Sequence, residues 1–189
     1  MQELKERIYR DGVIIGNDIL KVDSFINHQI DTELLDKICK FLSSKFSGVN
    51  KILTIETSGI AYAIGVARYF GNIPVLFAKK SESKTVDMRT VLTTNIKSFT
   101  RGIDCVVTVN KNYLTEGDNV LIVDDFLAEG NACLGLIDLC NQAGAHVVGA
   151  AIVIEKGFQG GRERIEDLGI RVESAAVIEK FEDGKVVLK

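Results

Sequence analysis

The sequence predicts an α/β fold in which a mostly parallel, twisted sheet is covered by helices on both faces. Two observations carry this prediction. Apolar runs typical of buried strands alternate with helical patterns along the chain. A long apolar run at 147–155 also suits a central strand that is buried on both faces. Sheets of this kind bind ligands beyond the carboxyl ends of their strands, so the polar residues that follow the strands are the candidate site.

The expected helices show apolar residues three or four positions apart, and they cover residues 3–11, about 32–46, 60–69, about 134–143 and 162–168. Asp31 is a suitable N-cap for the second of them. The expected strands are short apolar runs at residues 51–56, 74–78, 91–99, 105–109, 120–123, 147–155, 170–178 and 186–188. Residues 79–90 are polar and charged without a buried face, so we expect a mobile loop there.

Length and composition exclude several classes of protein. A chain of 189 residues with 46% hydrophobic content suits one well-packed domain, and we expect a single domain over 1–189. The net charge of -3 gives no indication of a nucleic-acid partner. No apolar run reaches the roughly 18 residues of a membrane span. The N-terminus has no signal-peptide pattern and the four cysteines form no C-x-x-C pair, so we expect a cytoplasmic protein with reduced thiols.

The most informative segment runs from Val120 to Ala132. Four apolar residues predict a buried strand, two adjacent carboxylates, Asp124 and Asp125, follow where that strand is expected to end, and a short loop with one glycine leads into a helix. Carboxylates suit sugar hydroxyls, and the N–H groups of a loop and helix start suit a phosphate. A ribose 5-phosphate needs both.

Polar residues also follow two other expected parallel strands. Thr57, Ser58 and Gly59 form a turn after one strand, and Lys79 and Lys80 follow the next. Because the carboxyl ends of parallel strands meet at one edge, we expect both groups to converge with the carboxylate pair. Taken alone, the turn is also explained as an ordinary helix cap, and the lysines as a solvated strand end.

The segment 120–132 resembles the phosphoribosyl diphosphate binding motif of the type I phosphoribosyltransferases. The resemblance extends along the chain to the bacterial xanthine phosphoribosyltransferases, through residues 20–31, 56–61, 124–128 and 153–158. It implies the type I phosphoribosyltransferase fold, with a small hood formed by about 1–30 and 156–189. It also implies transfer of the 5-phosphoribosyl group to N9 of xanthine in purine salvage, a magnesium ion that arrives with the diphosphate substrate rather than in a protein metal site, and a homodimer.

Residue roles follow from the resemblance together with residue chemistry. Asp124 and Asp125 are expected to be catalytic, because they accept hydrogen bonds from the ribose hydroxyls and favour a cationic sugar. The residues expected to bind phosphoribosyl diphosphate are Ala128, Glu129, Gly130, Asn131 and Ala132 at the 5-phosphate, and Thr57, Ser58, Gly59, Lys79 and Lys80 at the diphosphate. The 79–90 loop is expected to close over the diphosphate.

Three further residues are expected to bind the purine. Lys156 ends a long apolar strand, and its ammonium can donate to the 6-oxo group, although a surface lysine at a strand end explains it too. By resemblance, Leu20 and Asn27 lie in the hood over the base. Asn27 can both donate and accept, so it can recognise the 2-oxo group and the adjacent N–H of xanthine.

One stretch departs from the family pattern. The wider superfamily usually carries Thr-Gly-Gly-Thr where this chain has Glu129-Gly130-Asn131-Ala132. Backbone N–H groups can still hold the phosphate, since Gly130 and the helix start remain. We expect the Glu129 side chain to point away from the phosphate, because its charge is unfavourable there.

Two other functions stay open. Guanine and hypoxanthine share the 6-oxo group with xanthine, so the base specificity is not settled by the sequence. Some proteins of this fold only sense phosphoribosyl diphosphate and regulate DNA binding through an added domain. Here about 50 residues precede the first expected sheet strand, and they show no basic recognition helix.

Overall fold

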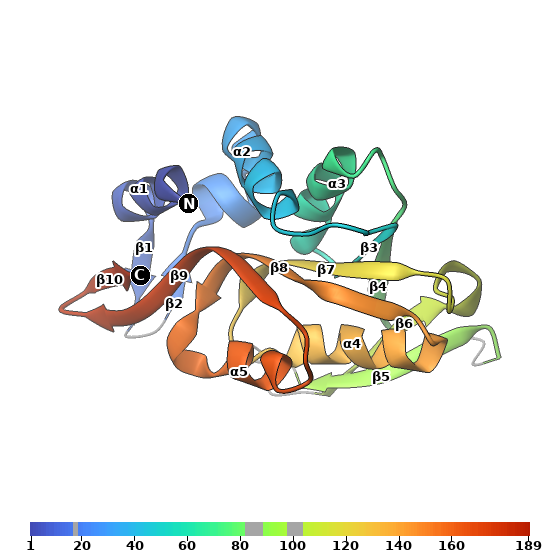
Figure 1. Cartoon of the computed structure of the whole chain (residues 1–189). Coiled ribbons are helices and arrows are strands. Elements are labelled where there is room, and N and C mark those ends of the chain that lie inside the picture. The colour runs from blue at the N-terminus through green and yellow to red at the C-terminus, as the bar shows by residue number, and fades with distance from the viewer. Residues whose placement is uncertain (17–18, 82–88, 98–103) are drawn as a thin grey trace.

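A computed structural model of the protein describes residues 1–16, 19–81, 89–97 and 104–189. Within them an eight-stranded sheet forms the centre of the molecule, in the order β10-β9-β8-β7-β3-β4-β6-β5 (Figure 1). Its strands are β3 (Lys51–Ile55), β4 (Val75–Ser81), β5 (Val91–Lys97), β6 (Asp104–Asn110), β7 (Asn119–Leu127), β8 (His146–Lys156), β9 (Val172–Glu182) and β10 (Lys185–Leu188). The central pairs, from β9 through β8, β7 and β3 to β4, are parallel, and the outer pairs are antiparallel. The predicted fold class is confirmed.

Helices cover both faces of this sheet (Figure 1). On one side lie α1 (Gln2–Asp11), α2 (Thr32–Ser43) and α3 (Gly59–Tyr69), and on the other lie α4 (Asn131–Ala143) and α5 (Gly161–Glu166). The side chains of β7 alternate between the two layers: Leu121 and Val123 pack in the cluster with α1 to α3, whereas Val120 and Ile122 pack in the cluster with α4. This double burial is why the strand has a continuous apolar sequence.

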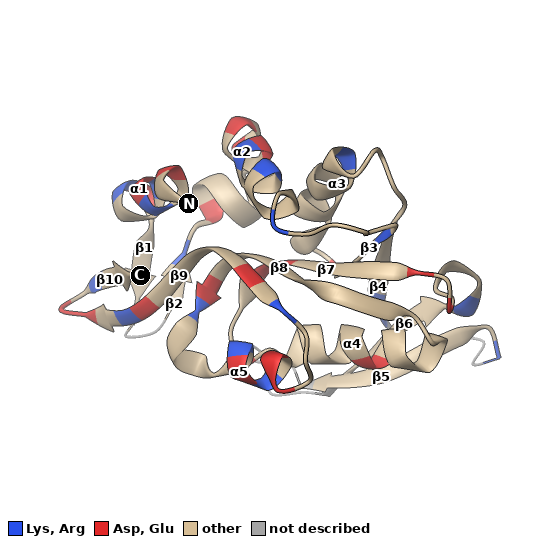
Figure 2. Ribbon diagram, viewed as in Figure 1, with Lys and Arg blue, Asp and Glu red and all other residues tan. Residues whose placement is uncertain are grey.

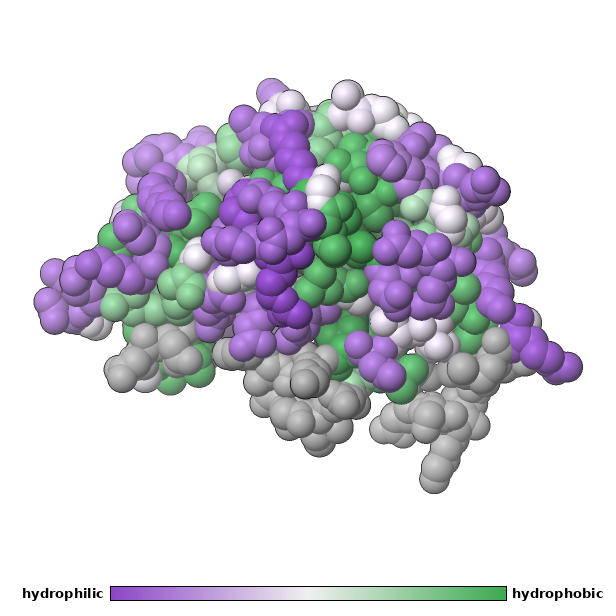
Figure 3. All heavy atoms as spheres, turned by 60° about the horizontal axis from the view of Figure 1, so that its bottom comes forward, coloured by the Kyte–Doolittle hydropathy of each residue, from purple (hydrophilic) through white to green (hydrophobic). Residues whose placement is uncertain are grey.

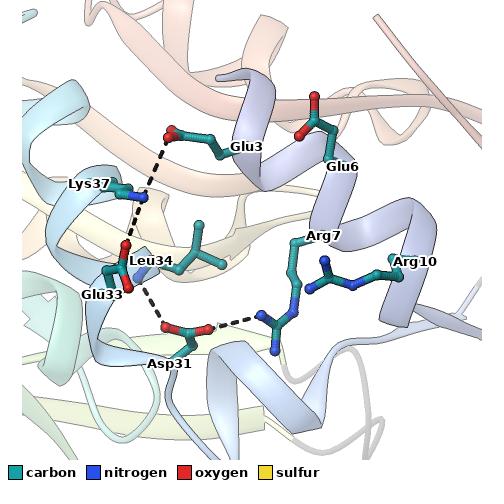
Figure 4. A pocket seen from close by; sticks show the side chains of 8 residues that line it. All are labelled: Glu3, Glu6, Arg7, Arg10, Asp31, Glu33, Leu34 and Lys37. Atoms are coloured by element: carbon teal, nitrogen blue, oxygen red, sulfur yellow. Dashed lines mark hydrogen bonds and ion pairs between the residues drawn. The ribbon is translucent and has the colours of Figure 1, made fainter.

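The N-terminal segment is fixed to the start of α2. The Asp31 carboxylate accepts a hydrogen bond from Leu34 N at 3.1 Å, which confirms the predicted N-cap, and this bond lowers the pKa of Asp31. Arg7 of α1 reaches the same carboxylate at 2.9 Å (Figure 4). A charged groove of about 240 Å³ lies between these helices, and none of the predicted site residues lines it.

Several short elements were not predicted. The strands β1 (Val13–Ile15) and β2 (Ile19–Lys21) form a separate antiparallel pair, and a π-helical turn, η1 (Asp23–Asn27), follows. Short 3₁₀ turns, η2 (Lys111–Tyr113) and η3 (Gly157–Gln159), occur later. Elements of three to five residues are too short to show a hydrophobic period, so no sequence pattern indicates them.

The two ends of the chain lie close together (Figure 1). The Met1 ammonium donates to Ala175 O of β9, and Leu188 N of β10 donates to the Tyr9 hydroxyl of α1 at 3.3 Å. The N-terminal helix and the last two strands therefore form one continuous region.

Several predicted boundaries were wrong. Residues 79–81 belong to β4 and not to a loop, because Lys79 and Lys80 pair with Thr108 and Val107 of β6. The rest of the predicted mobile loop, apart from residues 89–90, lies outside the described residues, as do residues 98–99 of the next predicted strand. Helix α2 ends at Ser43, earlier than predicted.

Charges of both signs lie side by side along α1 and α2 (Figure 2). Of the helices that the structure describes, none has the length and apolar character needed to cross a membrane.

Candidate active site

The carboxylate pair lies inside β7 rather than after it, which corrects the predicted strand end. The pairing of β7 with β3 ends at Leu53–Ile122, whereas its pairing with β8 continues to Leu127–Glu155. Asp124 and Asp125 therefore follow the last β3 partner while β8 still holds their backbone. Both side chains are largely buried, at 6% and 7% exposure, in the centre of the sheet's carboxyl edge.

Burial and a neighbouring charge change the acidity of Asp124. Burial and the neighbouring Asp125 charge raise the pKa of Asp124 well above its usual value. Asp125 N also donates to Asp124 Oδ1 at 3.0 Å. Asp124 therefore holds its proton more strongly than an exposed aspartate does.

The turn after β3 lies directly against Asp124. Helix α3 begins at Gly59, one residue before the predicted start, with Ser58 as its N-cap residue, and the peptide bond between Glu56 and Thr57 is cis. A Cβ on Gly59 would lie 3.0 Å from Asp124 Oδ1 and would collide with the buried Thr54 hydroxyl. Of the turn predicted for this strand end, Gly59 therefore lies beside Asp124.

The two predicted lysines, Lys79 and Lys80, lie in different surroundings. Lys80 N donates to Glu56 Oε1 at 2.5 Å, which ties the ends of β3 and β4 together. The Lys80 charge also acts on the Asp124 carboxyl, lowering its pKa against the larger effect of burial. The Lys79 ammonium lies 6.0 Å from the centre of the Phe77 ring, on the alternate face of the strand. The structure thus brings Lys80 toward the carboxylates and leaves Lys79 on the other face.

The glycine loop forms the start of α4. Gly130 is the N-cap residue and has a φ of 82°, a left-handed conformation that favours glycine. The first N–H groups of α4, from Asn131 onward, have no intrahelical acceptor and are available to an anion. The Glu129 carboxylate accepts a hydrogen bond from Asn131 Nδ2 at 3.1 Å.

The predicted base-binding residues come from three elements. Lys156 is the last residue of β8 and is buried, at 9% exposure. Asn27 ends η1, and its Nδ2 lies 3.4 Å from Asp125 Oδ2. Leu20 of β2 is buried in the apolar cluster of α1 to α3. Asn27 is thus placed beside the carboxylate pair, while the contacts of Leu20 are those of a core residue.

Beside Lys156, Glu155 is held by an ion pair that the sequence did not indicate. Arg162 of α5 donates to both Glu155 oxygens, at 2.9 and 2.6 Å, and Ser174 Oγ donates to one of them at 2.5 Å. These bonds fix the end of β8 and raise the pKa of Arg162.

Two residues of α5, Gly161 and Arg164, also contact the glycine loop and were missed at the sequence level. They lie more than 30 residues from the loop in the chain. No local pattern connects positions so far apart.

A mostly parallel sheet with paired carboxylates and a glycine-started helix at its carboxyl edge is typical of proteins whose site suits a phosphorylated ligand. Residues 27–183 match the family described as the phosphoribosyl transferase domain. The chain belongs to this phosphoribosyltransferase family.

Relatives match over the full length. The chain is 52% identical to xanthine phosphoribosyltransferase 1 of Clostridium perfringens, with all of both chains covered. It is 53% identical to the xanthine phosphoribosyltransferase of Clostridioides difficile, over 98% of each chain. For the enzyme of Bifidobacterium adolescentis the identity is 49%, over 96% of this chain and 95% of the relative.

Solved structures support the fold. The adenine phosphoribosyltransferase of Rhodothermus marinus gives a TM-score of 0.76 at 21% identity, with 94% of this chain and 100% of that chain covered. The Giardia lamblia enzyme in complex with 9-deazaadenine gives a TM-score of 0.74 at 21% identity, with 92% of this chain and 96% of that chain covered.

Proposed function

We propose that this protein is a xanthine phosphoribosyltransferase of purine salvage. It transfers the 5-phosphoribosyl group of 5-phospho-α-D-ribose 1-diphosphate to N9 of xanthine, giving xanthosine 5′-monophosphate and diphosphate. The full-length identity of about one half to xanthine phosphoribosyltransferases supports the reaction and the base. The observation that carries the site is the close approach of Gly59 to Asp124, on whose carboxyl the Lys80 charge also acts.

The chemistry needs charge stabilisation rather than a protein nucleophile. The bond from the anomeric carbon to the diphosphate oxygen breaks, the bond to N9 forms, and the N9 proton is released to solvent. Positive charge grows on the ribose during this exchange, so the buried pair Asp124 and Asp125 stabilises it while accepting hydrogen bonds from the ribose hydroxyls. The residues otherwise orient the substrates and exclude water.

The phosphate groups are bound at two places. The backbone of Ala128 to Ala132 holds the 5-phosphate at the start of α4, and the turn Thr57 to Gly59 holds the diphosphate at the start of α3. Lys80 offsets the charge of the leaving diphosphate, whereas Lys79 lies on the other face of β4 beside Phe77.

Magnesium enters with the diphosphate substrate. Such an ion needs few protein ligands, because Mg²⁺ takes its ligands mainly from phosphate oxygens, sugar hydroxyls and water. When bound, the ion neutralises negative charge on the diphosphate. The part of the chain that the structure describes contains no group of three or more His, Cys, Asp or Glu side chains able to hold a metal ion by itself.

The base lies between the end of β8 and the N-terminal segment. Lys156 donates to the 6-oxo group, and Asn27 recognises the 2-oxo edge from its place beside Asp125. Leu20 contributes to the apolar support of this segment. Residues 1–30 and 156–189 act as the hood of a single domain, and the contacts between the two ends of the chain support this assignment.

We further propose a cytoplasmic homodimer. The four cysteines are free, which suits a reducing compartment. Large hydrophobic side chains reach the surface, among them Tyr113 at 61% exposure and Leu168 at 57%. Figure 3 shows a band of hydrophobic residues between hydrophilic groups on one face, and such patches favour an interface. Light scattering coupled to size exclusion tests the oligomeric state.

A substrate panel tests the function. Xanthine, guanine, hypoxanthine and adenine are each incubated with phosphoribosyl diphosphate and Mg²⁺, and diphosphate release is measured. We expect xanthine to have the highest kcat/KM and adenine to be inactive, because adenine lacks a 6-oxo acceptor. Comparable turnover of hypoxanthine and xanthine would contradict narrow specificity. If none of the four purines causes diphosphate release while the protein still binds phosphoribosyl diphosphate, the protein is a sensor of phosphoribosyl diphosphate rather than an enzyme.

A further inference from the structure

The start of α5 packs directly against the glycine loop at the start of α4 (Figure 1). A Cβ on Gly161 would collide with Ala128 O and would lie 2.8 Å from Gly130 N. In return, a Cβ on Gly130 would lie 3.1 Å from Gly161 O. The two backbones therefore touch without room for a side chain, so α5 determines where the loop can lie.

Arg164 extends this contact with hydrogen bonds. Its Nη1 donates to Glu129 O and to Asn131 Oδ1, the latter at 2.9 Å. Asn131 Nδ2 in turn donates to the Glu129 carboxylate at 3.1 Å. We call Arg164, Asn131 and Glu129 the loop brace. Glu129 and Asn131 are two of the three positions at which this chain departs from the usual family sequence.

The loop brace fixes the direction of a backbone N–H group. A trans peptide unit is planar, with its C=O and N–H pointing in opposite directions. When Arg164 holds the carbonyl of Glu129, the N–H of Gly130 is fixed in the opposite direction. A loop without hydroxyl side chains depends on such backbone donors to hold a phosphate, so their orientation before binding matters more.

We propose that Arg164 is a positioning residue for phosphoribosyl diphosphate, which acts by holding the phosphate-binding loop in its binding conformation through Glu129 and Asn131. The proposal rests on the proposed role of residues 128–132. Arg164 itself does not touch the substrate. It is exposed on α5, so its replacement leaves the core intact.

Steady-state kinetics with a matched control tests this role. Arg164→Ala should raise the KM for phosphoribosyl diphosphate about fivefold, the size expected for losing charge-assisted hydrogen bonds at the surface. The KM for xanthine and the melting temperature should stay unchanged, and Arg164→Lys should restore part of the loss. Arg68→Ala, which removes an exposed arginine near the end of α3, should leave all constants unchanged. An equal change of both KM values, or a lower melting temperature alone, would overturn the proposal.

Two further variants separate this inference from the function on which it rests. The double variant Asn131→Ala/Arg164→Ala should lose less affinity for phosphoribosyl diphosphate than the sum of the losses in the two single variants. Both side chains belong to one hydrogen-bond network. Gly130→Ala disturbs the loop directly. If Gly130→Ala raises the KM for phosphoribosyl diphosphate and Arg164→Ala does not, the loop binds phosphate and the positioning role is wrong. If neither variant changes it, the proposed loop function is wrong as well.

Discussion

Asn27 Nδ2 donates to Asp125 Oδ2 at 3.4 Å, across 98 positions of the chain. The segment that carries Asn27 is itself anchored, because the buried Tyr62 hydroxyl of α3 donates to Ile26 O at 3.2 Å. A residue assigned to the base and a residue assigned to the sugar are therefore held as one unit. Binding of xanthine and stabilisation of the ribose should for this reason be coupled.

A double-mutant cycle measures this coupling. Asn27→Ala should raise the KM for xanthine and lower kcat, because it removes a contact to the base and leaves Asp125 less well oriented. Combined with Asp125→Asn, the loss should be smaller than the sum by about 1 kcal/mol. Asn141→Ala on the exposed face of α4 serves as the control. Strict additivity would show that the two side chains act independently.

Lys156→Ala should weaken use of the base selectively. The ammonium at the end of β8 donates to the 6-oxo group in the proposed complex, so the KM for xanthine should rise by about tenfold or more. The affinity for phosphoribosyl diphosphate should change little. Lys180→Ala, which removes an exposed lysine of β9 paired with Glu182 at 2.8 Å, provides the comparison. Unchanged xanthine kinetics in Lys156→Ala would show that Lys156 does not bind the base.

Gly59→Ala should reduce turnover by moving a catalytic carboxylate. The new methyl group would lie 3.0 Å from Asp124 Oδ1 and would collide with Thr54, so the turn or Asp124 must shift. We expect kcat to fall about 100-fold, as small misplacements at a reacting centre do. Gly117→Ala, where nothing lies within 4 Å of a new Cβ, should retain activity. Equal kcat values for Gly59→Ala and Gly117→Ala would contradict the close approach of Gly59 to Asp124.

The raised pKa of Asp124 predicts a pH-dependent stability. The folded protein keeps this proton at pH values where the unfolded chain, with an ordinary pKa near 3.8, has released it. The resulting stability is fully present below the unfolded pKa and is lost as the pH rises through the raised pKa of the folded state. In ligand-free protein, Asp124→Asn should flatten this decline. Thermal unfolding between about pH 4 and 8 measures how stability declines in the original protein and in Asp124→Asn. Parallel curves for the two proteins would contradict a role of Asp124 in this decline.

Arg162→Ala should destabilise the fold. The Glu155 side chain is only 2% exposed, and Arg162 is its charged partner in the described structure. Removing Arg162 leaves a buried carboxylate without its cation, which costs about 3 kcal/mol in the free energy of unfolding. Glu166→Gln removes the half-exposed partner of the same arginine and should cost under about 1 kcal/mol. Urea unfolding compares the two, and similar losses would mean that burial of Glu155 is unimportant.

The sequence predicted those parts of the candidate site whose residues are neighbours in the chain. The pair Asp124 and Asp125, the turn at Gly59 and the glycine before α4 each combine a buried strand with a polar end, a pattern that short windows reveal. The extents of β4 and β7 were missed, because they depend on pairing with β6 and β8, which the sequence does not encode locally.

The sequence by itself determined the alternation of strands and helices, the double burial of the central strands and the residue types at the strand ends. These follow from hydrophobic period and turn chemistry, which act over a few residues. Only the tertiary structure decided the strand order, the approach of Asn27 to Asp125 and the contact of Arg164 with the loop at Val120 to Ala132. Contacts between residues 30 to 100 positions apart arise when packed layers bring elements together, and no local pattern specifies which elements meet.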